Sequence, residues 1–260
     1  MKVYIYNTAD EMAHAAANLA ASILTSCVAA KGNAVFVAAT GTSQLAFLAA
    51  LTTHKEIPWD KTIMFHLDEY IGLDESHPAS FRNYLRKHLI SKVPLGKYYL
   101  INGNAPDPET ECRRLAEIIS AYKIDIAFVG IGENGHLAFN DPPADFDTDA
   151  PYIVVKLDET SRFQQVKEGW FTKIEEVPHT AITMSIKCIL KAEVIIAVVP
   201  EARKALAVKQ TLEGPITPLC PATALRLHPN VHLFLDKDSA SMLDLSKLRA
   251  HYDIVVKERS

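Results

Sequence analysis

Ile124-Asp-Ile-Ala-Phe-Val-Gly-Ile-Gly-Glu-Asn-Gly-His-Leu-Ala-Phe-Asn-Asp141 is the stretch of sequence that decides the fold of this chain. It begins with an apolar run, Ile124–Val129, which is typical of a strand buried on both faces. The run ends in a glycine-rich turn that carries a histidine, an amide and a carboxylate. In open α/β sheets, ligands bind at the carboxyl ends of the parallel strands, so this turn is the first place to look for a site.

Segments with strand and helix patterns alternate along the whole chain. Apolar β-rich runs predict strands at Val3–Tyr6, Ala34–Ala38, Thr62–Leu67, Ile124–Val129, Ile153–Val155, Ala181–Met184, Glu193–Val199 and Val231–Leu235. Helical periodicity predicts helices at Asp10–Ala30, Leu45–Leu51, Phe81–Ile90, Glu109–Tyr122 and Glu201–Leu212. We therefore predict one α/β domain over residues 1–260, a Rossmann-like three-layer α/β/α sandwich with a mostly parallel central sheet and helices on both faces. The Pro- and Asp-rich segment Asp141–Pro151 predicts a loop that begins a lid over residues 141–170.

Composition is that of a globular protein of moderate charge. The net charge is -4 and 48% of residues are hydrophobic, which suffices for a sizeable core and gives no general attraction to nucleic acid or anionic membranes. Cys27, Cys112, Cys188 and Cys220 are scattered without a CxxC pair, which favours reduced thiols and a cytoplasmic protein. The amino terminus lacks a signal-peptide pattern, and we expect no apolar run near the roughly 20 residues of a membrane span.

The glycines of the turn formally satisfy GxGxxG, the fingerprint of a dinucleotide site. Such a site needs a helix that opens directly at the turn, so that its N-terminus holds the pyrophosphate. Here Pro142 and Pro143 end any helix within about two turns, so we reject a nicotinamide site and expect no cofactor. Gly132 and Gly135 are expected instead to form a tight turn that brings the backbone and His136 close to a ligand.

His136 is the first candidate catalytic residue. Asn134 and Asp141 lie close to it in the sequence, and both belong to the same loop at the end of the strand. A carboxylate that accepts a hydrogen bond from one ring nitrogen leaves the other nitrogen free to move protons near neutral pH.

Asp68 and Glu69 are the second candidates, because they directly follow the predicted strand Thr62–Leu67. They should emerge at the same edge of the sheet as His136. If the strand continues, alternation sends the two carboxylates to opposite faces, so only one of them is expected to act in the site.

An anion site is expected where a predicted strand joins a predicted helix at Thr40-Gly41-Thr42-Ser43. Hydroxyls and backbone N–H groups at a helix N-terminus bind anions, although a plain helix cap explains the same residues. Arg203 and Lys204 follow another predicted strand and could add positive charge there, or form a solvated helix face. No HExxH or comparable spacing of metal ligands is present, so we expect metal-independent chemistry.

The chain resembles the glucosamine-6-phosphate deaminase family. The resemblance is carried, in the family's order, by Phe65-His-Leu-Asp-Glu-Tyr-Ile-Gly-Leu73, Ile101-Asn-Gly-Asn-Ala-Pro-Asp107, Gly130-Ile-Gly-Glu-Asn-Gly-His-Leu-Ala-Phe-Asn-Asp-Pro142, Lys204-Ala-Leu-Ala207 and Cys220-Pro-Ala-Thr-Ala-Leu-Arg-Leu-His-Pro229. It extends over nearly the whole chain. The wider superfamily includes 6-phosphogluconolactonases and the sugar-phosphate-sensing domains of transcription regulators.

The resemblance implies a cofactor-free conversion of glucosamine 6-phosphate and water to fructose 6-phosphate and ammonia. By position, His136 would open the sugar ring and Asp68 would take the C2 proton and return it at C1. Asn134 and Asp141 would orient His136. Glu69 would be a neighbouring polar residue at the substrate site and not the base.

The substrate site implied by the resemblance includes Thr40, Gly41, Thr42, Ser43, Gly132, Gly135 and Lys204. The phosphate arginine of the family falls near Ser161-Arg162, and Arg162 takes that role only with a one-residue shift. Asp141 stands where the family usually has glutamate, and its shorter side chain leaves an epimer such as galactosamine 6-phosphate open as the substrate.

Two further functions remain open at this stage. A 6-phosphogluconolactonase would need water attack on an ester and no C2 base, whereas the surroundings of Asp68 and Asp141 look more like the deaminases. A non-catalytic sugar-phosphate sensor would not need the Asp68–His136 pair. The expected partner is a hexosamine 6-phosphate, without nucleic acid or membrane, and the resemblance leaves both a monomer and a homo-oligomer open.

Overall fold

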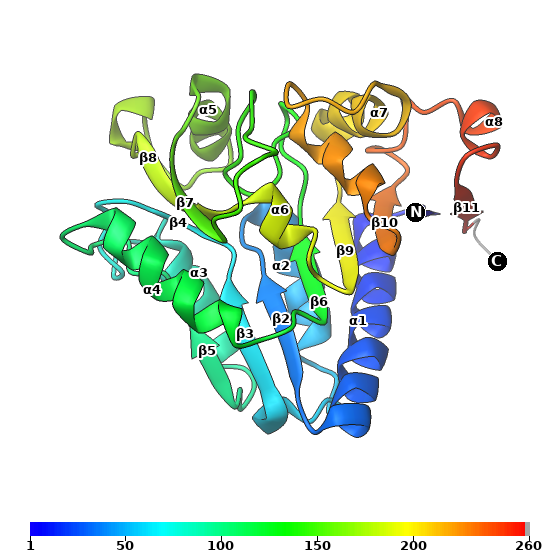
Figure 1. The fold of residues 1–260 in the computed structure, drawn as a ribbon. Coiled ribbons are helices and arrows are strands. Elements are labelled where there is room, and N and C mark those ends of the chain that lie inside the picture. Colours follow the sequence, from blue (N-terminus) through cyan, green and yellow to red (C-terminus); the bar gives the residue numbers. More distant parts are fainter. Residues whose placement is uncertain (258–260) are drawn as a thin grey trace.

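Eight parallel strands form the central sheet of the protein, of which a computed structural model describes residues 1–257 (Figure 1). Across the sheet they are β11 (Asp253–Val256), β1 (Lys2–Tyr6), β10 (Val231–Asp236), β9 (Val194–Val199), β6 (Ile126–Val129), β2 (Ala34–Ala38), β3 (Thr62–His66) and β5 (Lys97–Tyr99). Every neighbouring pair runs parallel, which confirms the predicted class of sheet. The two edge strands, β5 and β11, are short and half-exposed, and neither was predicted from the sequence.

The middle strands are buried on both faces, as their continuous apolar runs predict. In β2, Val35 and Val37 enter one core cluster, whereas Phe36 enters the other. Phe36 packs there against Phe128 of β6, with 5.7 Å between the ring centroids. Alternate residues of each strand therefore hold a separate layer of helices on each face of the sheet.

Two sets of helices cover these faces. One set comprises α1 (Ala9–Lys31), α2 (Thr42–Leu51) and α3 (Phe81–Leu85), which continues as a π-helical turn over Arg86–Ile90. The other comprises α4 (Pro108–Ser120), α6 (Ile186–Ile189), α7 (Ala205–Glu213) and α8 (Leu245–Leu248). The predicted three-layer α/β/α sandwich is thus confirmed.

Helix α1 corrects one expectation from the sequence. By length and composition alone it is apolar enough to cross a membrane, contrary to the expectation that no segment would be. Its buried face, which includes Met12, Ala16, Ala20 and Leu24, packs in the core cluster on the sheet. The alanines keep the helix close to the strands, and their hydropathy reflects this packing in the core.

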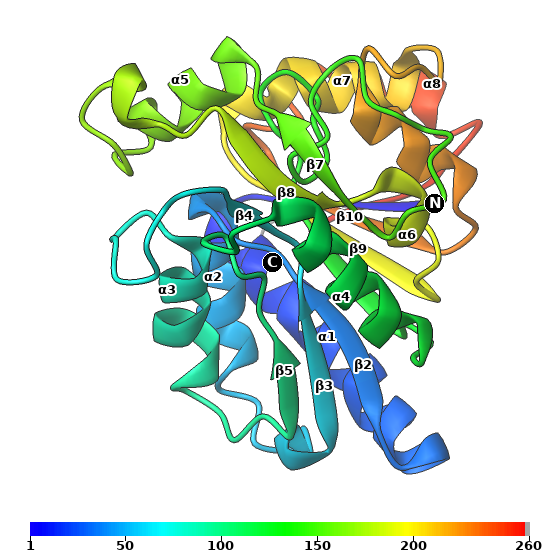
Figure 2. The same ribbon diagram turned by 60° about the vertical axis from the view of Figure 1, so that its left-hand side comes forward.

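A second, antiparallel sheet lies above the carboxyl ends of the central strands (Figures 1 and 2). It contains β4 (Asp68–Tyr70), β8 (Thr180–Met184) and β7 (Tyr152–Lys156). The strands predicted at 153–155 and 181–184 therefore exist but belong to this sheet. A short β-rich run does not reveal which sheet it joins, because pairing is decided by tertiary contacts.

Helix α5 (Glu159–Lys167) follows β7 and was not predicted. Its sequence is mostly polar, so it lacks the apolar periodicity of the other helices, but Asp158 caps it by accepting from the Ser161 N–H. The segment predicted as a lid thus consists of an irregular loop over 141–151, then β7, then α5. Motion of this segment stays a prediction.

Candidate active site

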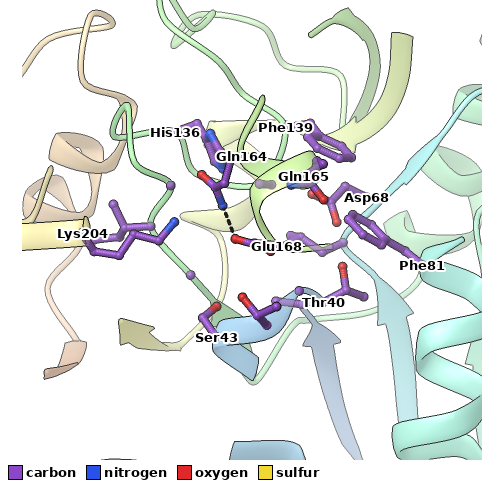
Figure 3. Close-up of a pocket in the computed structure, with 18 residues that line it drawn as sticks. Thr40, Ser43, Asp68, Phe81, His136, Phe139, Gln164, Gln165, Glu168 and Lys204 are labelled. Atoms are coloured by element: carbon purple, nitrogen blue, oxygen red, sulfur yellow. Dashed lines mark hydrogen bonds between the residues drawn. The ribbon is translucent and has the colours of Figure 1, made fainter. Parts of the chain in front are cut away.

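The loops after β2, β3, β6 and β9 meet at the carboxyl edge of the central sheet and, with α5, enclose a cavity of about 70 Å³ (Figure 3). Its polar and charged lining consists of Thr40, Thr42, Ser43, Asp68, His136, Gln164, Gln165, Glu168 and Lys204. Residues predicted from four separate strand ends are therefore brought into one space.

A tight turn after β6 positions His136. The Gly132 N–H donates to the His136 carbonyl and the Gly135 N–H donates to the Gly132 carbonyl, each at 3.0 Å. A Cβ at Gly132 would overlap the imidazole ring, so only glycine leaves room for the histidine there. Gly135 has a φ of +81° and its missing side chain makes space for Cys220. Gly132 lines the cavity whereas Gly135 does not, so the predicted substrate contact of Gly135 is replaced by a supporting role in the turn.

The imidazole of His136 is held by a polar network that reaches to the start of α5. Its Nδ1 lies 2.9 Å from the Ser161 hydroxyl and 3.2 Å from Asp141 Oδ1. Ser161 donates its single hydroxyl proton to Asp141, so it accepts from Nδ1–H. Asn134 accepts from the His136 N–H at 3.0 Å and donates to Asp158 at 2.8 Å. This arrangement favours the tautomer in which Nε2 carries a free lone pair for a ligand proton.

Asp141 is an ionised member of this network. Burial alone would raise the pKa of its carboxyl group, but the hydrogen bond and charge of His136 and the Ser161 hydroxyl outweigh burial, and the pKa falls below its ordinary value. Its second oxygen accepts from the Asp158 N–H at 2.9 Å. A charged Asp141 can therefore stabilise a positive charge that forms on His136.

Asp68 has the opposite environment at the start of β4. Its side chain lines the cavity and is 5% exposed. Burial, reinforced by the negative charge of Glu69, raises its pKa to about 8, although the Phe139 N–H acts against the shift. A carboxyl group with this pKa can both take and release a proton near neutral pH, which is the property of a general base.

Glu69 is directed away from the cavity, which corrects its prediction as a substrate contact. Its Oε2 accepts from the Ser80 hydroxyl at 2.9 Å, the Arg82 N–H at 2.8 Å and Arg82 Nε at 3.1 Å. Its Oε1 accepts from the Phe81 N–H at 3.1 Å, so the carboxylate caps the start of α3. The alternation expected of a continuing strand explains the outcome, because β4 places Asp68 and Glu69 on opposite sides.

The loop between β2 and α2 forms the lower wall of the cavity. Gly41 is the N-cap of α2 with φ +95°, and no side chain caps the helix. The Gly41 carbonyl accepts from the Tyr84 hydroxyl at 2.9 Å, which fixes the loop. Uncapped N–H groups and the positive end of the helix dipole favour an anion beside Thr40, Thr42 and Ser43.

Lys204 adds a cation at this end of the cavity, where it is 2% exposed. Burial and, to a lesser extent, the positive charge of Arg203 lower its pKa to about 8, against the opposing charges of Glu168 and Glu133. The Arg203 guanidinium donates to Glu133 at 2.9 Å, to Glu168 at 2.8 Å and to the Thr42 hydroxyl at 3.2 Å. Lys204 thus lines the cavity, whereas Arg203 lies outside the lining and is bound by the carboxylates of Glu133 and Glu168.

Arg162 lies outside the cavity lining, so its prediction as the phosphate ligand is corrected. Its guanidinium donates to the backbone carbonyls of Ile174 at 2.6 Å and Val177 at 3.0 Å. It is 7% exposed and braces the chain after α5. A buried guanidinium needs several acceptors, and here the backbone supplies them.

Sequence reasoning missed three polar residues of the cavity, Gln164, Gln165 and Glu168, all on or just after α5. It also missed Ser161, which links His136 to Asp141. The signal that could have found them is the Asp158 cap together with the polar helix that follows the predicted loop. Within residues 1–257, no group of three His, Cys, Asp or Glu side chains is arranged to hold a metal ion.

The model of the glucosamine-6-phosphate isomerase/6-phosphogluconolactonase family matches residues 7–233. The chain belongs to this family. Similar curated members are the glucosamine-6-phosphate deaminases of Bacillus thuringiensis (strain Al Hakam) and Bacillus cereus (strain AH820), each 36% identical over 242 residues, which are 93% of this chain and 89% of theirs.

Solved members of the glucosamine-6-phosphate isomerase/6-phosphogluconolactonase family share the fold. A monomeric glucosamine-6-phosphate deaminase is 32% identical and covers 94% of this chain and 100% of its own, with a TM-score of 0.86. A 6-phosphogluconolactonase from Shewanella baltica OS155 is 21% identical with a TM-score of 0.76, and covers 91% of this chain and 97% of its own. The latter likeness concerns the fold alone.

Proposed function

We propose that this protein is a glucosamine-6-phosphate deaminase that converts glucosamine 6-phosphate and water to fructose 6-phosphate and ammonia. One observation carries the proposal: Asp68 and His136 line one cavity, whose other end is lined by Lys204 and the loop Thr40–Ser43. The curated relatives support it, since those at 36% identity are glucosamine-6-phosphate deaminases.

His136 opens the sugar ring in this mechanism. Its free Nε2 takes the proton of the C1 hydroxyl and delivers a proton to the ring oxygen, which produces the open-chain aldehyde. The imidazolium that forms in between is stabilised by Ser161 and Asp141, which contact Nδ1.

Asp68 then performs the isomerisation. Its carboxylate takes the C2 proton, which the C1 carbonyl has acidified, and the electron pair forms the C1–C2 double bond of an enolamine while O1 takes a proton from solvent. Return of the proton from Asp68 to C1 gives the 2-iminium, which loses an N–H proton to solvent and becomes the 2-imine, and water hydrolyses that imine to the ketone and ammonia. Because Asp68 is buried with a pKa of about 8, its ionised form is a stronger base than an exposed aspartate.

The substrate phosphate binds at the other end of the cavity in this proposal. Thr40, Gly41, Thr42 and Ser43 surround it with hydroxyls and helix N-terminal N–H groups, and Lys204 supplies the positive charge. Cytoplasmic location, a lid over 141–170 and the assembly state stay predictions.

Galactosamine 6-phosphate is the second candidate substrate, because Asp141 is shorter than the glutamate that the family usually has there. An ammonia-release assay with glucosamine, galactosamine and mannosamine 6-phosphates tests the choice. We expect the highest kcat/KM with glucosamine 6-phosphate. Hydrolysis of 6-phosphogluconolactone without ammonia release from any amino sugar phosphate would contradict the proposal, as would binding without turnover.

A further inference from the structure

Two consecutive glutamines of α5, Gln164 and Gln165, line the same cavity but differ in their hydrogen bonding. The Gln164 amide is engaged at both atoms: Nε2 donates to Glu168 at 2.8 Å, and Oε1 accepts from the Glu133 N–H at 3.1 Å. Gln165 is 5% exposed, and its Oε1 is buried without a hydrogen-bond partner within the described chain. The Gln164 amide therefore bonds within the protein at both atoms, whereas the Oε1 atom of Gln165 has no partner there.

An unsatisfied amide at this depth has a cost that folding alone does not explain. A buried amide that has lost its contact with water needs a replacement partner, and most buried side-chain polar groups have one. An apolar side chain of the same shape at position 165 would avoid the cost altogether. A polar group kept in such a place is expected to gain its partner from a ligand.

The position of Gln165 indicates which part of the ligand it meets. In Figure 3 the Gln165 side chain lies at the Asp68 end of the cavity, on the opposite side from Lys204. The proposed function places the phosphate beside Lys204 and C2 of the sugar at Asp68. The orphan carbonyl oxygen is an acceptor, so it requires a donor close to C2.

We propose that Gln165 is the residue that recognises the amino group of the substrate, with Oε1 accepting an N–H from the C2 amine. The assignment rests on the proposed function, because Asp68 identifies where C2 lies. Gln165 is then a specificity-determining residue: it selects hexose phosphates with a donor at C2. Sites built to hydrogen-bond a polar group discriminate strongly against an analogue that lacks the group.

The test compares ligand binding by isothermal calorimetry in the wild type and Gln165→Met, which keeps the length of the side chain and removes the amide. Two ligands serve as probes. Glucosamine 6-phosphate is titrated into proteins that also carry Asp68→Asn, which prevents turnover. The second probe is 2-deoxyglucose 6-phosphate, which has no hydrogen-bond donor at C2. We expect Gln165→Met to weaken binding of the amino sugar about tenfold and to leave the 2-deoxy sugar within about twofold. Equal weakening of both probes, or of neither, would overturn the assignment.

Thermal unfolding without ligand separates this role from a structural one, with Gln164→Met as the matched control. Gln165→Met should unfold at the same or a higher temperature than the wild type, because it removes an unsatisfied group. Gln164→Met should unfold at a lower temperature, because it breaks two hydrogen bonds. A loss of stability in Gln165→Met as large as in the control would also overturn the proposal.

The conservative variant Gln165→Glu supplies a further check, because it keeps an acceptor at the same reach. It should retain the preference for the amino sugar over the 2-deoxy sugar, and loss of that preference would count against the proposal. Binding requires no turnover, so the result stays readable if the proposed function fails. Absence of ammonia release would refute the proposed deaminase activity, whereas absence of the expected difference in binding between the two sugars would refute only the role of Gln165.

Discussion

Asp68 and Asp141 are the same chemical group in two different environments of one site. Asp68 is buried beside a like charge, which raises its pKa to about 8. Asp141 is also buried, but His136 and Ser161 contact it and lower its pKa. The difference teaches that burial alone does not decide the charge of a carboxylate. Hydrogen-bond partners keep Asp141 ionised, whereas Asp68 has few of them, and this difference underlies the roles proposed for the two residues.

The largest expected effect comes from removing the base. Asp68→Asn should lower kcat for ammonia release by about 10³- to 10⁴-fold while glucosamine 6-phosphate still binds, because the amide cannot accept the C2 proton. Steady-state kinetics and calorimetric binding measure the two quantities. A loss of affinity as large as the loss of kcat would make Asp68 a ligand contact and remove the contrast with Asp141.

Removing the carboxylate of Asp141 should lower kcat less than removing that of Asp68. Asp141→Asn leaves a hydrogen-bonding side chain but no charge to stabilise the imidazolium, so kcat should fall about 10²-fold with little change in KM. Ser161→Ala serves as the companion variant, since it breaks the link between the two residues. If both variants keep wild-type kcat, Asp141 has no part in proton transfer.

The pH dependence of kcat/KM follows from two opposite shifts. Asp68 must be ionised, and its pKa is raised to about 8, so activity should increase as the pH rises towards 8. Lys204 must be protonated, and its pKa is lowered to about 8, so phosphate binding should weaken above that pH. We expect a maximum near pH 8 with a roughly tenfold fall per pH unit on each side.

Lys204→Arg provides the control for that profile. Arginine stays protonated throughout this range, so the alkaline limb should move to higher pH while the acidic limb remains in place. An acidic limb near pH 4 would show that Asp68 titrates as an exposed aspartate. The account of its burial would then be wrong.

The smallest expected change in kinetics comes from replacing a third carboxylate, that of Glu168. Glu168 lines the cavity and remains ionised: burial would raise its pKa, but Arg203 and Gln164 outweigh burial and lower it. Glu168→Gln should lower the KM for the phosphorylated substrate about threefold, because it removes a negative charge near the phosphate. Glu201→Gln is the matched control, since Glu201 also pairs with Arg203 but lies outside the cavity lining. Equal effects of the two variants would contradict this explanation.

That Asp68 and His136 line one cavity could be predicted from sequence, because both follow strand ends, which apolar runs mark clearly. Asp68 follows β3 and His136 follows β6, and the parallel sheet brings both to one edge. Strand alternation predicted that only one of Asp68 and Glu69 acts in the site, and the family resemblance selected Asp68. The meeting of the strand ends was predicted from local patterns and one rule of topology.

The α5 side of the site could not be predicted in the same way. The sequence of α5 is polar because the helix faces a ligand cavity and the His136 network, so it lacks the apolar period of a core helix. Arg162 shows why the role of a single residue is hard to predict from sequence. Its position near the phosphate arginine of the family predicted a phosphate ligand, but its guanidinium donates to two backbone carbonyls instead. The Asp158 cap marks where α5 begins, but long-range packing decides which of its side chains face the cavity.

Solvent deuterium incorporation tests the role of Asp68 most directly. Glucosamine 6-phosphate is incubated in deuterated buffer at pD near 8, and the C1 position of fructose 6-phosphate and the C2 position of recovered substrate are followed by NMR. In the wild type, the proton that Asp68 takes from C2 exchanges with solvent before it is returned to carbon, so deuterium should enter at these carbons. Asp68→Asn should place none above the level of buffer alone. Incorporation by Asp68→Asn at the wild-type rate would contradict the assignment of Asp68 as the base.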